Sequence, residues 1–541
     1  MTRGRLIAVG RGDEPPDLVI AGARVFGAFT KEWREVDVAV AEGRIAGLGH
    51  YAGGERVDAS GLLLVPGFID AHMHIESSKL MVDEFARAVL PHGTTAAVTD
   101  PHEIANVLGT DGVHWLLDVC EELPVEIFVM ASSCVPASPF ESPRRSLTTG
   151  DMESILRRSH ALGVAEMMNF PAVIAGQETE LRKLGVAGAT HVDGHAPGVT
   201  GKPLDAYLAA GIRSDHEATT YEEALEKRRK GMWVLLREAS NARNLVDLLP
   251  LVKAFGPERC AFCTDDREPD FLVREGHINQ MCRVAVSHGI RAEDAILMAS
   301  LHPALYHGLG DMGAIAPGYK ADLVLLEDLD SFRPVTVFKN GKLVAANGRA
   351  EPVPGRSVPI WVRRSVRPAP VKARDLVMAA RGKPVRVIGV IPRQLLTEEL
   401  VYEPSVRDGA LVADPARDLA KIAVVERHHA TGRIGKGLVT GFGLQCGAFA
   451  STVAHDAHNI VVVGMSDQDM VLCIERLVAI GGGILAADDG EVRAELPIPV
   501  AGLLSDAPFE EVVAALEAGA RSVDVTVETP TESTGQPGTR R

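Results

Sequence analysis

The chain has 541 residues, of which 46% are hydrophobic and 24% are charged. Because a single core stops growing at roughly 250–300 residues, this length predicts one large domain with one or two smaller units. The formal net charge of −16 disfavours nucleic acid as a partner, since a polyanion requires clustered Lys and Arg, and favours a small-molecule ligand.

Signals for export and for membrane insertion are lacking. The sequence has no run approaching the roughly 18 apolar residues of a spanning helix, and residues 1–10 do not resemble a signal peptide. Seven scattered cysteines are unlike a secreted disulfide framework. We interpret the C-x-x-C pair Cys260 and Cys263 as buried core thiols rather than metal or redox ligands. These features predict a cytoplasmic protein without a membrane partner.

Short strands are predicted near the N-terminus and again after residue 310. Apolar runs bounded by polar turns occur first at 18–20, 37–40 and 44–48. Similar runs return later at 321–326, 335–338 and 342–345. We therefore predict a small β-sandwich domain formed by residues 1–65 and 310–365, with a second domain inserted between its halves.

Residues 66–309 alternate short apolar runs with helical patterns, which is typical of β/α units. The runs are 62–70, 94–100, 126–133, 163–169, 189–195, 212–217, 233–240 and 259–266. Segments such as 221–230 and 242–254 have the apolar spacing of amphipathic helices. Eight units over about 240 residues match a (β/α)8 TIM-like barrel, although an open doubly wound sheet also gives alternating units.

The rest of the sequence predicts an additional domain. Residues 352–371 are rich in Pro and Arg and are interpreted as a linker. Residues 366–528 are expected to form a C-terminal α/β domain, and the polar residues 529–541 are expected to be a disordered tail.

Metal-binding residue types recur where the predicted barrel strands end, which is where barrel enzymes carry their functional groups. His72 and His74 stand two apart, so both can face one side of a strand and suit Zn²⁺, Mn²⁺ or Fe²⁺. Later strand ends carry Asp100, His102, Glu103, Glu166, His191, Asp193, His195, Asp215, His216, Glu217, Asp265 and Asp266. Because such groups are costly to bury unless paired or metal-bound, we interpret the set as a metal site.

The segment Pro66-Gly-Phe-Ile-Asp-Ala-His-Met-His74 resembles the opening motif of the amidohydrolase superfamily. Other segments resemble the bacterial adenine deaminase family of that superfamily, so that the likeness covers nearly the whole chain. These segments are 99–106, 166–169, 193–198, 214–217, 263–267 and 454–464. The chain departs from the family at Glu268-Pro269, where His-Pro is common, and this difference concerns the rim of the pocket rather than a metal ligand.

The resemblance implies a binuclear centre that holds two Mn²⁺ or Fe²⁺ ions, with Zn²⁺ as an alternative. In this centre His72, His74 and Asp265 bind one ion. His195 and His216 bind the other ion, and Glu166 bridges the two. The spacing by itself leaves His191 as a rival to His195, and the family match selects His195.

The resemblance also implies a reaction, the hydrolysis of adenine to hypoxanthine and ammonia by a metal-bound hydroxide that attacks C6. Asp265 is the expected proton acceptor. Glu217 is expected to shuttle protons or, alternatively, to orient His216. His102, Glu103 and Arg237 are the expected substrate-binding residues, and ligation of an additional ion or capping of the following helix are alternatives for the first two.

Two other functions stay open. An amidohydrolase that acts on a modified purine or a cyclic amide would use the same ligands, because substrate choice resides in loops. A non-catalytic binding barrel would leave the full ligand set unexplained. We interpret the histidines of the C-terminal part as a domain-interface or lid loop rather than a second metal site. These are His428, His429, His455 and His458. A homo-oligomer, a dimer in the simplest case, is expected.

Overall fold

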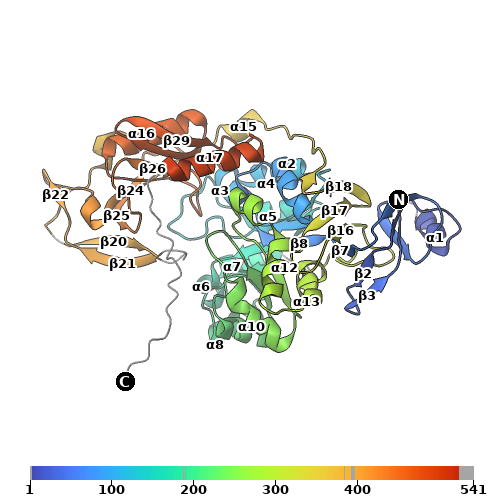
Figure 1. The fold of residues 1–541 in the computed structure, drawn as a ribbon. Coiled ribbons are helices and arrows are strands. Elements are labelled where there is room, and N and C mark those ends of the chain that lie inside the picture. The colour runs from blue at the N-terminus through green and yellow to red at the C-terminus, as the bar shows by residue number, and fades with distance from the viewer. Residues whose placement is uncertain (1–2, 187, 189–190, 383, 392–396, 523–541) are drawn as a thin grey trace, which may run out of the picture.

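The computed structural model describes residues 3–186, 188, 191–382, 384–391 and 397–522 (Figure 1). The predicted disordered tail and the first two residues of the fifth predicted strand run lie outside these ranges. A helix that the sequence analysis does not predict, α1 (Arg3–Arg11), packs Val9 against the small domain. Within the described residues, no helix has the length and apolar character required to traverse a bilayer.

Two sheets form the small β domain. The first has the order β5-β4-β1-β6. Its strands are β1 (Leu18–Ala21), β4 (Val38–Ala41), β5 (Arg44–Leu48) and β6 (Glu55–Asp58). The second has the order β19-β18-β17-β16-β7-β2-β3. Its strands are β2 (Arg24–Gly27), β3 (Glu32–Glu35), β7 (Leu63–Pro66), β16 (Leu323–Leu326), β17 (Pro334–Lys339), β18 (Lys342–Ala346) and β19 (Arg349–Ala350).

The two halves of this domain meet in the second sheet, where β7 pairs antiparallel with β16. Residues from both halves, such as Ile20 and Leu64 from the first and Leu325 from the second, share one core. The chain therefore leaves the small domain after β7, forms the barrel, and returns to the same domain at β16.

Parallel strands form the wall of the barrel. They are β8 (Phe68–Met73), β9 (Thr94–Thr99), β10 (Glu126–Ser132), β11 (Ala161–Met167), β12 (Val192–Gly194), β13 (Ser214–Asp215), β14 (Trp233–Arg237) and β15 (Cys260–Cys263). Hydrogen-bonded pairing runs from β8 to β12 and from β13 to β15. The Arg213 amide donates to the Val192 carbonyl at 3.1 Å, and a parallel bridge joins Met73 to Asp265. These contacts join the two sheets at both edges, so that the eight strands described here close into a barrel.

Helices surround the strands, and local sequence explains several of their starts. They are α2 (Val82–Val89), α3 (His102–Leu108), α4 (Thr110–Cys120), α5 (Thr149–Leu156), α6 (Phe170–Ile174), α7 (Glu178–Val186), α8 (Gly201–Ala209), α9 (Tyr221–Arg229), α10 (Leu245–Phe255), α11 (Pro269–Arg274), α12 (Ile278–Ser287), α13 (Ala292–Ala299) and α14 (Leu301–Tyr306). Thr148 and Asp151 form a capping box at α5, and the Thr220 side chain accepts from the Glu223 amide at α9.

The first predicted strand run, 62–70, is divided between two sheets in the structure. Its first part is β7 of the small domain and its second part is β8 of the barrel. Gly67 lies at the division, where an added Cβ would be 2.2 Å from Thr95 Oγ1. A residue without a side chain is therefore required where the chain passes from one sheet to the other.

Gly67→Ala is expected to destabilise the protein by about 1–3 kcal/mol, because its methyl group overlaps Thr95 in a closely packed core. The midpoint of urea denaturation measures this loss. Gly150→Ala in α5 is the control, since its added Cβ has Thr148 Oγ1 as nearest neighbour at 3.7 Å, an ordinary contact. Equal midpoints for both variants would show that Gly67 is not needed for close packing.

The C-terminal domain contains one mixed sheet covered by helices. Its order is β21-β20-β25-β24-β27-β26-β28-β29. These strands are β20 (Val385–Val390), β21 (Thr397–Tyr402), β24 (Ala420–Val425), β25 (Ile434–Thr440), β26 (Ala448–Ser451), β27 (Ile460–Gly464), β28 (Gly483–Asp488) and β29 (Glu491–Pro497). The accompanying helices are α15 (Ile360–Arg363), α16 (Asp467–Ile480) and α17 (Phe509–Ser522), and a two-stranded ribbon is formed by β22 (Val406–Arg407) and β23 (Ala410–Leu411). Helix α16 packs Met470 and Leu477 on the sheet.

The small β domain and the C-terminal domain lie on opposite sides of the barrel (Figure 1). The Phe509 amide at the start of α17 donates to Glu84 of α2 at 2.9 Å, which ties the C-terminal domain to the barrel. The predicted fold class is confirmed: a (β/α)8 barrel is inserted into a small β-sandwich, and an α/β domain follows it. The residue boundaries given above for the domains stay a prediction.

Candidate metal centre

Four histidines and two carboxylates from different strands converge at the carboxyl ends of the barrel strands. His72 lies in β8 and Glu166 in β11, whereas His74, His195 and His216 follow directly after β8, β12 and β13, and Asp265 is the second residue after β15. One ligand atom each of His72, Glu166, His216 and Asp265 lies within 4.8 Å of the others. Parallel strands end at one rim of a barrel, which explains why residues nearly 200 positions apart in the chain meet here.

Glu166 lies at the middle of this group and divides it into two pairs. Its Oε1 is 3.2 Å from His72 Nε2 and 2.8 Å from His74 Nε2. Its Oε2 is 2.7 Å from His195 Nδ1 and 3.3 Å from His216 Nε2. One carboxylate therefore faces two histidines with each oxygen, an arrangement suited to bridging two cations.

Asp265 faces the first of these pairs. Its Oδ1 is 3.1 Å from His74 Nε2 and 4.0 Å from His72 Nε2. If the strand stayed regular, Asp265 and Asp266 would point to opposite sides. The strand instead ends at Cys263, and Asp265 has a φ of 55°, in the left-handed region. This turn brings both carboxylates to the barrel mouth, a strained conformation of the kind found at functional sites.

A backbone contact fixes the tautomer of His74. Its Nδ1 lies 2.9 Å from the Asp100 carbonyl oxygen, which can only accept a hydrogen bond. The proton of neutral His74 therefore sits on Nδ1, and the lone pair of Nε2 points toward Glu166 and Asp265. Metal-binding histidines are commonly held in this way.

The electrostatics of the group favour added positive charge. Burial by itself lowers the pKa of His72, but the carboxylates of Asp193 and Glu166 outweigh it and raise that pKa to about 10. His195 behaves similarly, since Glu166 overcomes the effect of burial and raises its pKa to about 9. Burial opposes ionisation of Glu166, yet the surrounding histidines hold its pKa well below the usual range. Protons or divalent cations are therefore both favoured here, and they compete for the same nitrogens.

Glu217 and Arg237 form the side of the site near the second pair of histidines. Arg237 Nη1 donates to Glu217 Oε1 and, at 3.0 Å, to Asp265 Oδ2. Glu217 Oε1 is also 3.8 Å from His195 Nδ1 and 3.6 Å from His216 Nε2. The buried guanidinium keeps two carboxylates together, because unpaired charges would be costly here.

Of the other predicted residues, His102 lies beside the group, since one ligand atom each of His74, His102 and Glu166 lie within 4.8 Å of one another. His102 packs its ring 4.5 Å from that of His74, and its Nδ1 is 3.3 Å from Asp100 Oδ2. Its Nε2 finds no hydrogen-bond partner among the described residues. Glu103 is turned instead toward the C-terminal domain. His191 lies apart from Glu166, with its Nε2 2.9 Å from His307 Nδ1, so the structure places His195 rather than His191 in the group.

Asp100 and Asp193, which belong to the predicted strand-end set, and Tyr306 support the group without being ligands in the predicted centre. Asp100 Oδ2 accepts from the Glu166 amide at 2.6 Å and so fixes the backbone of the central carboxylate. Asp193 Oδ2 lies 3.9 Å from His72 Nδ1, and Tyr306 donates to the other oxygen of Asp193 at 2.5 Å. Asp100 and Asp193 lie in the motifs at the strand ends, so the sequence could have indicated their supporting role. Tyr306 in α14 lies in no such motif.

The predictions for the C-x-x-C cysteines and for the histidines of the C-terminal domain concern residues outside the metal-binding group. Cys260 and Cys263 are free and buried in β15. His428 Nε2 lies 2.8 Å from the Ala457 carbonyl oxygen within the C-terminal domain. His455, in contrast, reaches the barrel and contacts Glu103, as a domain-interface loop requires.

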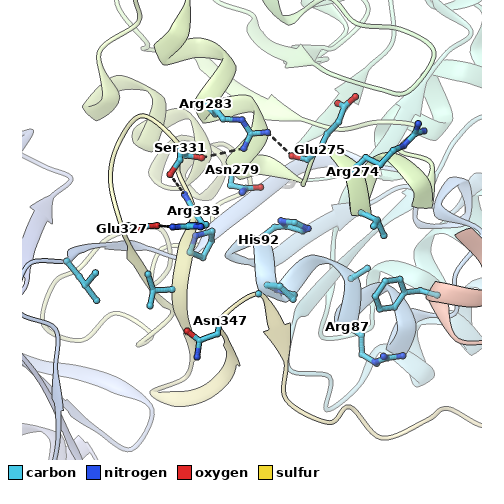
Figure 2. A pocket seen from close by; sticks show the side chains of 18 residues that line it. Arg87, His92, Arg274, Glu275, Asn279, Arg283, Glu327, Ser331, Arg333 and Asn347 are labelled. Atoms are coloured by element: carbon cyan, nitrogen blue, oxygen red, sulfur yellow. Dashed lines mark hydrogen bonds and ion pairs between the residues drawn. The ribbon is translucent and has the colours of Figure 1, made fainter.

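A cavity of about 880 Å³ lies away from the metal-binding group, between α2, α11 and the strand β17 (Figure 2). Arg283 and Arg333 line it, and both are engaged within the described structure. Arg283 donates to the Glu275 carbonyl at 2.8 Å, and Arg333 pairs with Glu327. The residues described as lining this cavity include none of the group around Glu166.

Comparison with known proteins assigns the family. The chain matches the Amidohydrolase family over residues 63–344 and the Adenine deaminase C-terminal domain over residues 394–531. It is 46% identical over 516 residues to "Adenine deaminase 2" of Carboxydothermus hydrogenoformans, which covers 95% of this chain and 90% of that protein. It is 44% identical over 534 residues to "Adenine deaminase" of Desulfatibacillum aliphaticivorans, covering 98% of this chain and 92% of the relative.

Solved structures with similar folds have lower identity. The beta-aspartyl dipeptidase of Fervidobacterium islandicum AW-1 has 18% identity and a TM-score of 0.45, and covers 62% of this chain and 98% of its own. A D-hydantoinase has 15% identity and a TM-score of 0.47, covering 62% and 96%. The family assignment rests on the sequence matches, which extend over nearly the whole chain. The chain therefore belongs to the amidohydrolase family and, within it, to the adenine deaminases.

Proposed function

We propose that this chain catalyses the hydrolytic deamination of adenine to hypoxanthine and ammonia at the group around Glu166. The observation that carries this proposal is the placement of Glu166, whose two carboxylate oxygens each face two histidines. The choice of adenine as the substrate is taken from relatives named adenine deaminase, which are 42–46% identical to this chain.

The donor set fits two divalent cations. Imidazole and carboxylate ligands suit Mn²⁺, Fe²⁺ and Zn²⁺, and we favour Mn²⁺ or Fe²⁺. His72, His74 and Asp265 would hold one ion. His195 and His216 would hold the other, with Glu166 shared between them. The free lone pair of His74 Nε2 supports this assignment, because it faces both carboxylates. Bound metal ions would lower the pKa of water, so that hydroxide is available near neutral pH.

The protein residues would then move protons and hold the purine. Asp265 is ionised because neighbouring histidines and Arg237 outweigh burial and hold its pKa well below the usual range. It can therefore accept the proton of the attacking water. Glu217, which shares Arg237 with Asp265, would pass a proton to the purine ring or to the departing amino group. His102, Glu103 and Arg237 are the proposed substrate-binding residues.

The product assay provides the direct test. The purified chain, stripped of metal and reloaded separately with Mn²⁺, Fe²⁺ or Zn²⁺, is expected to release ammonia from adenine and to contain about two ions per chain. The metal-free protein should be inactive, and activity should return on reloading. Bound metal without ammonia release from adenine would overturn the proposed substrate. Turnover of a modified purine or a cyclic amide would then favour the alternative amidohydrolase reaction.

A further inference from the structure

The loop of residues 452–459, between β26 and β27 of the C-terminal domain, reaches the barrel mouth. His455 Nε2 lies 2.9 Å from Oε1 of Glu103, the second residue of α3, and His458 Nε2 lies 3.6 Å from its Oε2. The side chains of Glu103 and His458 are fully buried, whereas that of His455 is 37% exposed. Two imidazoles of one domain thus contact one buried carboxylate of another.

Glu103 connects this loop to the residues next to the metal-binding group. Ser77, three residues after His74, has its Oγ 3.0 Å from Glu103 Oε1 and 2.5 Å from Asp266 Oδ1. One hydroxyl has one proton and can donate to only one of two carboxylates. His455 Nε2, which is 3.8 Å from Asp266 Oδ1, supplies the second donor to the pair.

Two histidines and a glutamate are also a set that binds divalent cations, and their ligand atoms lie within 4.8 Å of one another. The backbone argues against a cation here. The Ala454 amide donates to His458 Nδ1 at 3.1 Å, so the proton of neutral His458 sits on Nε2 and faces Glu103. This is the reverse of His74, whose Nδ1 donates to a carbonyl and whose Nε2 is left free for a metal.

We propose that His455 and His458 are positioning residues of the deaminase site, which hold the Glu103 carboxylate and, through it, the Ser77 hydroxyl in the orientation that binds substrate. This inference rests on the proposed function, with Glu103 as a substrate-binding residue. The C-terminal domain accordingly completes the active site. The charge balance agrees with this role. Burial opposes ionisation of Glu103, but both histidines lower the pKa of its carboxyl group, and Glu103 raises the pKa of His455 against the effect of burial.

The activity test compares His455→Ala, His455→Gln and Glu103→Gln in the full Mn²⁺-loaded chain. His455→Ala is expected to raise KM for adenine roughly 10- to 100-fold, the effect of losing a hydrogen bond to a charged group, with a smaller change in kcat. His455→Gln, which keeps an N–H donor, should recover part of this loss. The double variant His455→Ala/Glu103→Gln should be no worse than Glu103→Gln, because the histidine acts through Glu103. His429→Ala, an exposed histidine of the same domain, is the control.

A second measurement does not depend on adenine turnover. Hydrogen exchange in residues 452–459 is expected to become at least several-fold faster in Glu103→Gln and to stay unchanged in His429→Ala. An unchanged KM in His455→Ala, additive effects in the double variant, or unchanged exchange would overturn the proposal. Loss of a third bound ion in His458→Ala would overturn it in favour of a cation site. If the wild type released no ammonia from adenine, the proposed function would fail. Hydrogen exchange would still test the contact between the loop 452–459 and Glu103.

Discussion

Replacing Glu166 by Gln is expected to remove most of the bound metal and to lower kcat/KM for adenine by more than about 1,000-fold. Metal ions contribute several kcal/mol to reactions of this kind, and each 1.36 kcal/mol is a factor of ten in rate. Glu166 is the one carboxylate of the described group whose two oxygens each contact two histidines. An amide has the same shape but lacks the negative charge that two adjacent cations require. Metal analysis of the purified variant, together with steady-state kinetics, measures both effects.

The matched control is Glu180→Gln. Glu180 is a buried carboxylate of the adjacent helix α7 and pairs with Lys183 at 3.1 Å, outside the metal-binding group. This variant is expected to retain about two ions and most of the activity. If Glu166→Gln kept both ions and its activity, a bridging role for Glu166 would be excluded.

Asp265→Asn is expected to lower kcat by roughly 10²- to 10⁴-fold, the usual contribution of a general base, while most of the metal stays bound. The amide cannot accept the proton of the attacking water, whereas the histidines and Glu166 remain as ligands. Asn also tolerates the left-handed backbone that Asp265 adopts, so the fold should be preserved. Metal content measured beside kcat separates this result from that of Glu166→Gln.

Asp270→Asn serves as control for the same segment of chain, since Asp270 pairs with Arg274 on α11. Its activity should equal that of the wild type. An Asp265→Asn enzyme with normal kcat would assign proton transfer to another group. Glu217 would then be the next residue to replace, because it shares Arg237 with Asp265.

The role proposed for the C-terminal domain gives the part of the chain that matches the Adenine deaminase C-terminal domain a place in the reaction. Its loop 452–459 contacts Glu103 at the start of α3, while α17 is tied to α2 by the Phe509 amide. The domain is thus joined to the barrel both beside the metal-binding group and at α2, and the Ser505 amide adds a further contact by donating to the Lys79 carbonyl at 2.7 Å. Variants that weaken the contact between Phe509 and Glu84 should lower the free energy of unfolding more than they weaken substrate binding.

Much of the fold follows from local sequence. Alternating apolar runs and amphipathic segments predict the barrel. Strands and helices can be told apart in the sequence because their apolar residues recur with different periods. The helix α9 begins at Tyr221 as predicted, where the Thr220 side chain caps it. The division of the run 62–70 between two sheets could not be predicted, since it depends on how closely Gly67 approaches Thr95, a residue of the next barrel strand.

The sequence by itself determined the types of the candidate ligands and their positions at strand ends, because spacing and residue chemistry are local properties. Only the tertiary structure decided which of them meet. His191 and His195 are equivalent by spacing, and closure of the barrel brings His195 to Glu166 while His191 turns to His307. Asp265 and Asp266 both reach the mouth because the backbone leaves the strand conformation. The contact between His455 and Glu103 joins residues 352 positions apart, and only the packing of two domains brings such residues together.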